Sequence, residues 1–432
     1  MTKKEVKRLT FLTYCLGCRT NQAEINKIGK ELTQYGFTPS EEEPNVILIN
    51  TCVVTDKAER ETRKAIRHFR RLYPNAFLVV SGCGVDAKQK LKINLPEADL
   101  FIENLKKQKT SGLIARHFQQ RLRHLSGGVI KDKYFLSGRA LLKIQEGCNK
   151  FCSYCIVPFL RGKPKSLPPE KVVQQINKLG EQGVEEVVLT GINLALYGKD
   201  LEPITCLTEL LGKILKETRI ERTSLSSIEP DIVDKNFIDL FLKNKRLSRY
   251  FHLALQSGSS TILKRMGRKT NLKKLLGFLL LIKQKIPEFV FRTDILVGFP
   301  GETEKEFKET IDFVKKAKIS FAHVFPYSQR PGTKASFWVQ KGVLEDLPKK
   351  IKKQRARILQ SVVKKIRLQE GKGLVGKTLP CLFIQKEDFF YRAIASNSWP
   401  VKIFCKEKNL RGKIKEVNIS GYQQNFLLGN LG

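Results

Sequence analysis

Short apolar runs alternate with helix-forming stretches along most of this 432-residue chain. Runs of β-branched and aliphatic residues that are separated by helices predict a parallel, doubly wound sheet of the α/β class. Near the N-terminus we expect three such strands, at Leu9–Tyr14, Val46–Asn50 and Phe77–Val80. Helices are predicted from about Asn21 to Gln34 and over Asp56–Leu72. The first part of the chain is therefore predicted to be an α/β unit.

The alternation restarts after Ser126–Lys133, a Gly- and Lys-containing stretch that is typical of a linker. Six more strand–helix units follow, and such a series predicts a parallel barrel or partial barrel, a (β/α)6 partial TIM barrel. We expect its strands at Ala140–Ile144, Glu186–Thr190, Thr223–Ser227, Phe251–Leu255, Val290–Leu296 and Phe321–Tyr327.

The C-terminal part changes character after a basic helical stretch at Asp346–Leu368. Short β-like runs such as Thr378–Ile384 and Val401–Phe404 then predict a small β-barrel. The predicted domains are residues 8–125, residues 138–368 and residues 369–432.

The charge balance favours a polyanionic partner. Lys and Arg number 79 against 42 Asp and Glu, a net charge of +37 with a pI near 9.9. Nucleic acid is the commonest partner of so basic a chain. The basic stretch is either a solvated surface or an RNA contact, and its place beside a small β module favours RNA.

A membrane partner is not expected. The longest apolar cluster, Leu275–Ile282, is far shorter than the roughly 20 residues of a membrane helix. The first residues, Met1–Lys7, contain no apolar signal region, so a cytoplasmic location is expected.

Three cysteines form a C-x3-C-x2-C run at Cys148, Cys152 and Cys155. A cubane iron–sulfur cluster normally takes four thiolates, so three leave one iron open to a non-protein ligand. The alternative is a structural zinc site, but such sites usually come as paired C-x2-C knuckles. The next cysteine, Cys206, is far away and alone.

Three other cysteines each follow one of the N-terminal strands: Cys18, Cys52 and Cys83. Ligands of open parallel sheets bind at the carboxyl ends of the strands, so these thiols can converge as a second three-thiolate site. The alternative is three unrelated small residues in strand-end turns. Cys15, Cys206, Cys381 and Cys405 fall outside both sets. Cys15 forms a C-x2-C pattern with Cys18, so it either competes for iron or zinc or, as we expect, is a buried strand cysteine.

Several longer motifs resemble one family, the radical S-adenosylmethionine (SAM) methylthiotransferases. The resemblance covers nearly the whole chain, although the last ~40 residues match loosely the family's RNA-binding TRAM domain. Its motifs are the segments around Cys18, Cys52 and Cys83, then Cys148–Gly162, Phe251–Gly258, Thr293–Glu302 and Phe325–Thr333.

The resemblance implies the cofactors and the chemistry. Cys148, Cys152 and Cys155 would hold a 4Fe–4S cluster that cleaves SAM, and Cys18, Cys52 and Cys83 would hold a second 4Fe–4S cluster that supplies sulfur. A second SAM would provide the methyl group of the methylthio product. Cofactor radical chemistry suits the target, because an aromatic C2–H of adenine is not acidic enough for ordinary base catalysis.

The resemblance also implies the substrate. The segments Gly17–Glu24 and Cys52–Arg60 look most like the branch that modifies C2 of threonylcarbamoyl-adenosine, just 3′ of the tRNA anticodon. The other branches act on isopentenyl-adenosine of tRNA or on an aspartate of a small-subunit ribosomal protein. Expected partners are the tRNA anticodon arm and a flavodoxin- or ferredoxin-like electron donor, while the sulfur donor stays unidentified. A different class, a non-catalytic tRNA-binding protein stabilised by metal, also remains open.

Six residues are candidate SAM contacts. Tyr154 precedes the last cysteine, where radical SAM proteins place an aromatic near adenine, and its alternative role is packing. Gly191 and Asn193 follow a strand and are placed to approach the SAM backbone. Glu229, Gln256 and Asp294 lie at predicted strand ends, where they either bind ribose or cap a loop.

Overall fold

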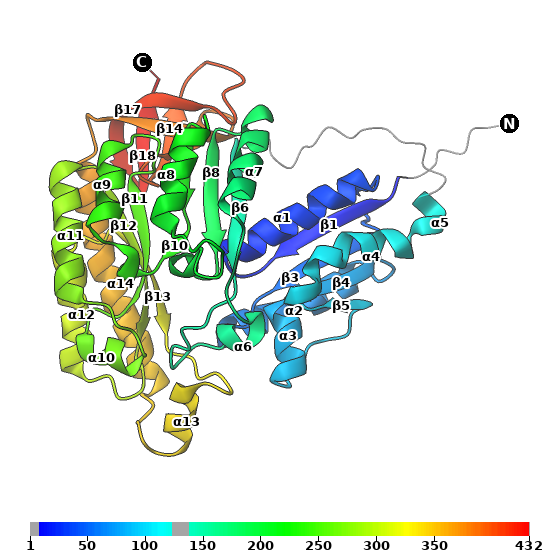
Figure 1. The fold of residues 1–432 in the computed structure, drawn as a ribbon, viewed down its shortest axis with the longest axis horizontal. Coiled ribbons are helices and arrows are strands. Elements are labelled where there is room, and N and C mark those ends of the chain that lie inside the picture. The colour runs from blue at the N-terminus through cyan, green and yellow to red at the C-terminus, as the bar shows by residue number, and fades with distance from the viewer. Residues whose placement is uncertain (1–7, 123–137, 432) are drawn as a thin grey trace.

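The computed structural model describes residues 8–122 and 138–431. The predicted linker Ser126–Lys133 lies outside these residues. The described chain forms an N-terminal sheet with helices, a central partial barrel and a small C-terminal β-barrel (Figure 1). The predicted α/β class, partial barrel and C-terminal β-barrel are thus confirmed.

The N-terminal sheet is wholly parallel, with strand order β2-β1-β3-β4-β5. Its central strand, β3, is buried on both faces, as its apolar sequence predicts. The bounds of the strands are β1 Thr10–Cys15, β2 Thr38–Pro39, β3 Val46–Thr51, β4 Phe77–Gly82 and β5 Leu100–Ile102.

Helices cover both faces of this sheet, which makes it doubly wound. Ile25, Ile28 and Leu32 of α1 pack on one face, and Ile66 and Phe69 of α2 pack on the other. The helices are α1 Arg19–Gln34, α2 Asp56–Leu72, α3 Cys83–Lys90, the 3-10 helix η1 Asn104–Lys109, α4 Thr110–His117 and α5 Gln119–Leu122.

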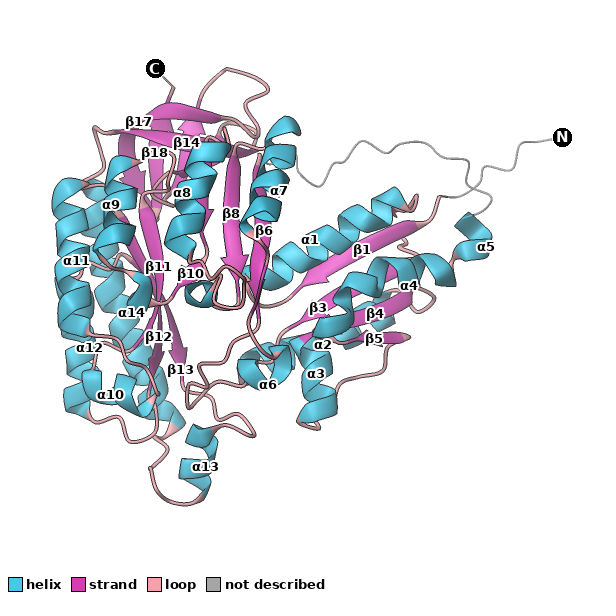
Figure 2. Ribbon diagram, in the orientation of Figure 1, coloured by secondary structure: helices cyan, strands magenta, loops and turns pink. Residues whose placement is uncertain are grey.

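The central barrel has its strands inside and its helices outside (Figure 2). The predicted strand Thr223–Ser227 is two short strands, because the chain pairs first with β8 and then, past Ser226, with β11. The strands are β6 Arg139–Glu146, β8 Glu186–Gly191, β9 Arg222–Leu225, β10 Ser227–Ile228, β11 Tyr250–Gln256, β12 Val290–Val297 and β13 Phe321–Pro326, with β7 Lys165–Ser166 antiparallel to β6.

The barrel helices follow from amphipathic sequences with local start signals. Helix α12, for example, begins with a capping box in which Thr303 and Glu306 satisfy each other's backbone N–H groups. The helices are α6 Val157–Arg161, α7 Pro169–Glu181, α8 Leu207–Glu217, α9 Lys235–Lys243, α10 Ser260–Arg265, α11 Leu272–Lys285, α12 Glu304–Lys316, α13 Lys334–Gln340 and α14 Lys349–Lys372, with η3 Leu194–Leu196 and η4 Pro230–Ile232.

The C-terminal strands close into a barrel in the order β14-β15-β16-β18-β17. This barrel lies against the amino-terminal ends of the central strands. The backbone N–H of Arg249, just before β11, donates to Ser396 O at 2.8 Å, and Arg222 Nη1 at the start of β9 donates to Pro380 O at 3.2 Å. The strands are β14 Thr378–Lys386, β15 Tyr391–Ala395, β16 Pro400–Phe404, β17 Ile414–Gln423 and β18 Phe426–Asn430.

Helix α14 corresponds to the basic stretch of the sequence, and part of its charge is structural. Lys352 pairs with Asp346 at 2.6 Å and Arg355 pairs with Glu302 at 2.7 Å, both as buried side chains. The remaining cations of α14 are exposed except Arg367, which is half-buried and donates from Nη2 to Asn425 O at 2.9 Å. In the ranges 8–122 and 138–431, no helix has both the length and the apolar character needed to span a bilayer.

Candidate active site

The first group of thiols, called here the N-terminal cysteine group, comprises Cys18, Cys52 and Cys83. Cys18 caps α1 after β1, Cys52 follows β3 directly, and Cys83 begins α3 after β4. All three therefore lie at the carboxyl-terminal edge of the parallel sheet. The turn before Cys18 approaches Cys52 so closely that a Cβ on Gly17, where φ is +101°, would lie 3.2 Å from Cys52 Sγ.

The second group, called here the barrel cysteine group, comprises Cys148, Cys152 and Cys155 in the loop between β6 and α6. Asn193 Nδ2 donates to Cys148 Sγ at 3.6 Å, and Arg268 Nη1 donates to Cys152 Sγ at 3.8 Å. Burial raises the pKa of the Cys155 thiol to about 12. The loop thus brings three thiols to the carboxyl-terminal mouth of the barrel, where barrel enzymes hold their chemistry.

One arginine, which follows the barrel cysteine group in the chain, contacts the N-terminal cysteine group. Arg161 ends α6, only a few residues after Cys155, and is buried. Its Nε donates to Cys83 Sγ at 3.3 Å and its Nη2 donates to Asn21 Oδ1 at 2.5 Å. The segment that carries the barrel cysteine group therefore reaches into the N-terminal cysteine group.

A buried carboxylate, Glu24 of α1, anchors this connection. It pairs with Arg161 at 2.9 Å, with Lys143 of β6 at 2.9 Å, and with Lys107. Burial opposes ionisation, but these three cations outweigh it and hold the pKa of Glu24 well below its usual range. Arg161 also pairs with Glu146 at 2.9 Å, so every cation of this cluster has a carboxylate partner.

The donor chemistry of both groups fits an iron–sulfur cluster. Each offers three thiols and a cationic arginine beside one sulfur, and positive charge favours the thiolate that binds metal. Within residues 8–122 and 138–431, no three Cys, His or acidic side chains converge on the position of one metal ion. A cubane cluster takes one thiolate per iron, so its ligands need no such common point.

Three predicted SAM contacts lie around the barrel cysteine group. Asn193 bonds to Cys148, as described above, and its backbone N–H donates to Gln145 Oε1 at 2.8 Å. Gly191 ends β8, where an added Cβ would lie 2.8 Å from Gln145 Cβ, so the backbone passes close to that side chain. Tyr154 packs beside the apolar cluster that contains Met266 and Phe299.

The sequence predicts the other three SAM contacts at strand ends, and Glu229 and Gln256 lie there, but Asp294 lies within β12 because that strand continues to Val297. Glu229 pairs with Arg268 and, at 3.4 Å, with Lys150. Gln256 ends β11 with φ +71°, a left-handed conformation that is uncommon outside glycine. Asp294 of β12 lies 3.1 Å from His252 Nε2 and accepts from Ser227 Oγ at 3.1 Å.

Sequence reasoning missed several residues at these sites. Arg161 contacts Cys83 and Arg268 contacts Cys152, while Glu24 pairs with Arg161. His252 stacks on His323 at 5.8 Å between ring centroids. Glu24, Arg161 and His252 lie in motifs that the sequence already singles out, whereas Arg268 and His323 do not. Nothing in the local sequence relates Glu24 to Arg161, because the pair forms across two sheets.

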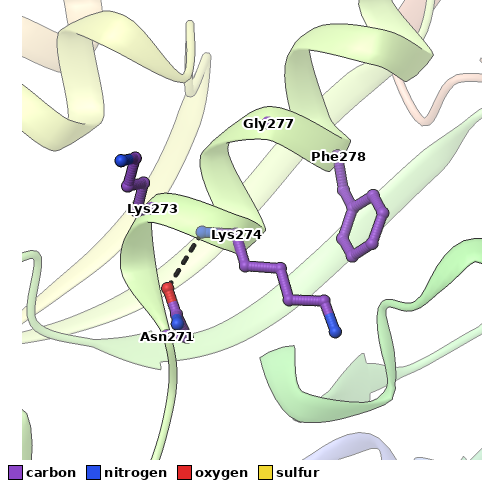
Figure 3. A pocket seen from close by; sticks show the side chains of 5 residues that line it. All are labelled: Asn271, Lys273, Lys274, Gly277 and Phe278. Atoms are coloured by element: carbon purple, nitrogen blue, oxygen red, sulfur yellow. Dashed lines mark hydrogen bonds between the residues drawn. The ribbon is translucent and has the colours of Figure 1, made fainter.

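Cys15 and one surface hollow fall outside both cysteine groups. Cys15 is half-buried at the end of β1, and burial raises the pKa of its thiol to about 12. The hollow in Figure 3 lies at the start of α11, where Asn271 Oδ1 accepts from the Lys274 N–H at 3.0 Å. Its volume is about 420 Å³, and it is lined by Asn271, Lys273, Lys274, Gly277 and Phe278. None of these residues is a predicted site residue.

Comparison with known proteins gives the family. A profile of the radical SAM superfamily matches residues 142–314, and a profile described as uncharacterized protein family UPF0004 matches residues 10–103. The chain is 37% identical over 385 residues to the threonylcarbamoyladenosine tRNA methylthiotransferase MtaB of Aquifex aeolicus, covering 86% of this chain and 92% of that protein.

A second relative carries another name. The chain is 34% identical over 387 residues to a tRNA-2-methylthio-N(6)-dimethylallyladenosine synthase of Clostridium botulinum, covering 85% of this chain and 84% of that protein. Among solved structures, the radical SAM methyltransferase TsrM of Kitasatospora setae has a TM-score of 0.54 at 15% identity, covering 78% of each chain. That likeness shows a shared fold.

One profile spans the N-terminal sheet, and the other spans most of the central barrel together with the C-x3-C-x2-C loop at its mouth. The radical SAM match makes the chain an enzyme that uses SAM and a 4Fe–4S cluster. The relatives above 30% identity span most of their own length and of this chain. The chain therefore belongs to the radical SAM methylthiotransferase family.

Proposed function

We propose that this enzyme transfers a methylthio group to C2 of threonylcarbamoyl-adenosine, beside the anticodon of tRNA. The observation that carries the proposal is the contact between Arg161 and Cys83 at 3.3 Å. It brings the segment that follows the barrel cysteine group into contact with the N-terminal cysteine group through one buried side chain. A reaction that needs both SAM cleavage and a sulfur source requires two such groups next to each other.

In this proposal, the barrel cysteine group holds one 4Fe–4S cluster and the N-terminal cysteine group holds the second. The bound clusters and SAM supply the electron, the sulfur and the methyl group of the reaction. The protein positions the thiols that would hold the clusters. Asn193 and Arg268 orient the sulfurs of Cys148 and Cys152, and Arg161 orients Cys83. Tyr154, Gly191, Asn193, Glu229, Gln256 and Asp294 remain the proposed SAM contacts.

The substrate branch is supported by names among the relatives. MtaB proteins of Aquifex aeolicus and Bacillus subtilis, at 37% and 34% identity, are named for threonylcarbamoyladenosine. The second candidate substrate is isopentenyl-adenosine of tRNA, because relatives at 34% identity carry the dimethylallyladenosine name.

The test is nucleoside mass spectrometry on tRNA after anaerobic incubation with reconstituted enzyme, SAM and a reductant. A methylthio group gained on threonylcarbamoyl-adenosine supports the proposal. Gain on isopentenyl-adenosine would keep the reaction and change the branch. If SAM is cleaved but no tRNA is modified, the proposal is wrong, and the ribosomal-protein aspartate becomes the substrate to test.

A further inference from the structure

Helix α2 presents a row of basic side chains that no part of the proposed chemistry uses. Arg60, Lys64, Arg67 and Arg71 are spaced four, three and four residues apart, so they lie on one face of the helix. All four are exposed. We call these four residues the α2 basic row.

The opposite face of α2 is buried against the sheet. Thr62, Ala65, Ile66 and Phe69 are its buried residues, and the last two pack on β3 and β4. The amphipathic pattern thus fixes the rotation of the helix about its axis. Rotation of the basic row away from solvent would expose Ile66 and Phe69, so the row is a fixed surface.

The charges of the row are not used inside the protein. In the described part of the chain, none of its four side chains has a hydrogen bond or ion pair, whereas Arg63 pairs with Glu59 and Arg70 pairs with Asp99 at 2.7 Å. A surface hollow of about 580 Å³ is lined entirely by basic or imidazole side chains, which are Arg60, Arg63, Lys64, Arg67, His68 and Arg71.

The acidic residues of α2 do not cancel this charge. Asp56 and Glu59, in its first turn, pair with the buried Arg330 at 2.8 Å and 2.7 Å, and Glu61 lies 3.7 Å from Lys57. Repulsion among the four unpaired cations is unfavourable unless an anion is bound between them.

Helix α2 starts beside the N-terminal cysteine group, which places the α2 basic row near the proposed reaction site. Helix α2 begins four residues after Cys52, and its first turn is held to the barrel by Arg330 and by Ser328 Oγ, which accepts from the Asp56 N–H at 3.1 Å. The row therefore extends outward from the cysteine groups. The C-terminal β-barrel contacts the opposite, amino-terminal ends of the barrel strands.

We infer that the α2 basic row binds the phosphate backbone of the tRNA anticodon arm, next to the nucleotide that reacts. Side chains three or four residues apart on a helix lie about 5–6 Å apart, which suits contacts to neighbouring phosphates along one strand. Arginine suits such phosphate contacts because its guanidinium can donate two parallel hydrogen bonds. The inference rests on the proposed function, since it assumes a tRNA substrate.

The test is binding of an anticodon stem-loop RNA that carries threonylcarbamoyl-adenosine, measured by fluorescence anisotropy over a range of salt without SAM. The variant Arg60→Gln, Lys64→Gln, Arg67→Gln and Arg71→Gln should weaken binding by roughly tenfold to a hundredfold. Its plot of log affinity against log salt should lose about 3 units of slope, roughly 0.7–0.9 per lost phosphate contact.

A matched control removes four exposed cations from the outer helices α7, α8 and α9: Lys171→Gln, Lys178→Gln, Lys216→Gln and Lys243→Gln. It should bind RNA as the unmodified protein does. A charge-keeping variant, Arg60→Lys, Arg67→Lys and Arg71→Lys, should retain the salt slope, and thermal unfolding checks that every variant is folded.

Equal losses in the row variant and the control would overturn the inference, since binding would then follow net charge alone. Unchanged RNA binding by the row variant would also overturn the inference, but it would not contradict the proposal that tRNA is the substrate. If the unmodified protein binds no RNA at any salt, the proposed function fails together with the inference.

Discussion

Each cysteine group has an arginine that donates to one of its sulfurs, but the two arginines come from different places. Arg268, which contacts Cys152, belongs to the same barrel as the thiol it serves and also pairs with Glu229. Arg161, which contacts Cys83, comes from the barrel and crosses to the N-terminal sheet. The barrel cysteine group is thus completed within one part of the molecule, whereas the N-terminal cysteine group is completed only when two parts pack together.

The largest expected effect separates the two groups by function. Replacing Cys148, Cys152 and Cys155 by Ala should abolish SAM cleavage. Replacing Cys18, Cys52 and Cys83 by Ala should leave SAM cleavage intact and reduce methylthio transfer by more than about 100-fold, since loss of even an outer contact to a metal site costs about 10–100-fold. The measurement is 5′-deoxyadenosine formation alongside product mass spectrometry. Methylthio transfer by the second variant at the rate of the unmodified enzyme would contradict the two-cluster proposal.

The next effect concerns the arginine that crosses between the two parts. Arg161→Gln should lower the iron affinity of the N-terminal cysteine group by about 10–100-fold, because it removes a positioning contact to Cys83. It should also lower the free energy of unfolding by about 3–5 kcal/mol, because Glu24 and Glu146 lose a buried partner. Iron content and the electron paramagnetic resonance spectrum are measured in a background without the barrel cysteines, so that only one cluster is observed.

Arg268→Gln is the matched control for that variant. Made in a background without Cys18, Cys52 and Cys83, it should reduce iron retention by the barrel cysteine group, and the Arg161→Gln change should not. The charge-keeping variant Arg161→Lys should recover part of the iron affinity. If Arg161→Gln lowered iron retention equally in both cysteine groups, the contrast between a barrel group completed within one part and an N-terminal group completed by two parts would be wrong.

The smallest effect tests a buried ion pair away from both cysteine groups. Glu186 pairs with Arg222 at 3.1 Å and with Arg139 at 3.2 Å. Burial opposes ionisation of Glu186, but the attraction of these two arginines is larger and lowers its pKa from 4.5 to about 2. Its ion pairs therefore stabilise the fold above about pH 4.5, and this contribution is lost as the pH falls towards 2.

Glu186→Gln should accordingly lower the free energy of unfolding at pH 7 by about 3 kcal/mol and flatten the acid dependence below pH 4.5. Urea unfolding at several pH values measures both. Iron retention by either cysteine group should stay unchanged, because Glu186 touches neither. A loss of iron in this variant would mean that iron retention reports general stability instead of local contacts.

Much of the fold could be predicted from local patterns. Helix α2 has the predicted bounds Asp56–Leu72, since Thr55 caps its first turn and its buried residues recur at helical spacing. The other predicted barrel strands differ from the observed ones by one or two residues at their ends, but Thr223–Ser227 forms two strands because its pairing partner changes at Ser226. Which strand pairs with which depends on the neighbouring strands of the sheet, and the sequence of one strand alone does not indicate its neighbours.

The sequence by itself determined the C-x3-C-x2-C loop, the strand-end places of Cys18, Cys52 and Cys83, and the order of the three parts. These features depend on the spacing of residues and on the alternation of strands and helices, both of which can be read along the chain. The tertiary structure alone decided that Arg161 lies beside Cys83 and that Glu24 gathers Arg161, Lys107 and Lys143. Such a buried cluster is stable only when every charge meets its partner, and the partners meet only after two sheets have packed.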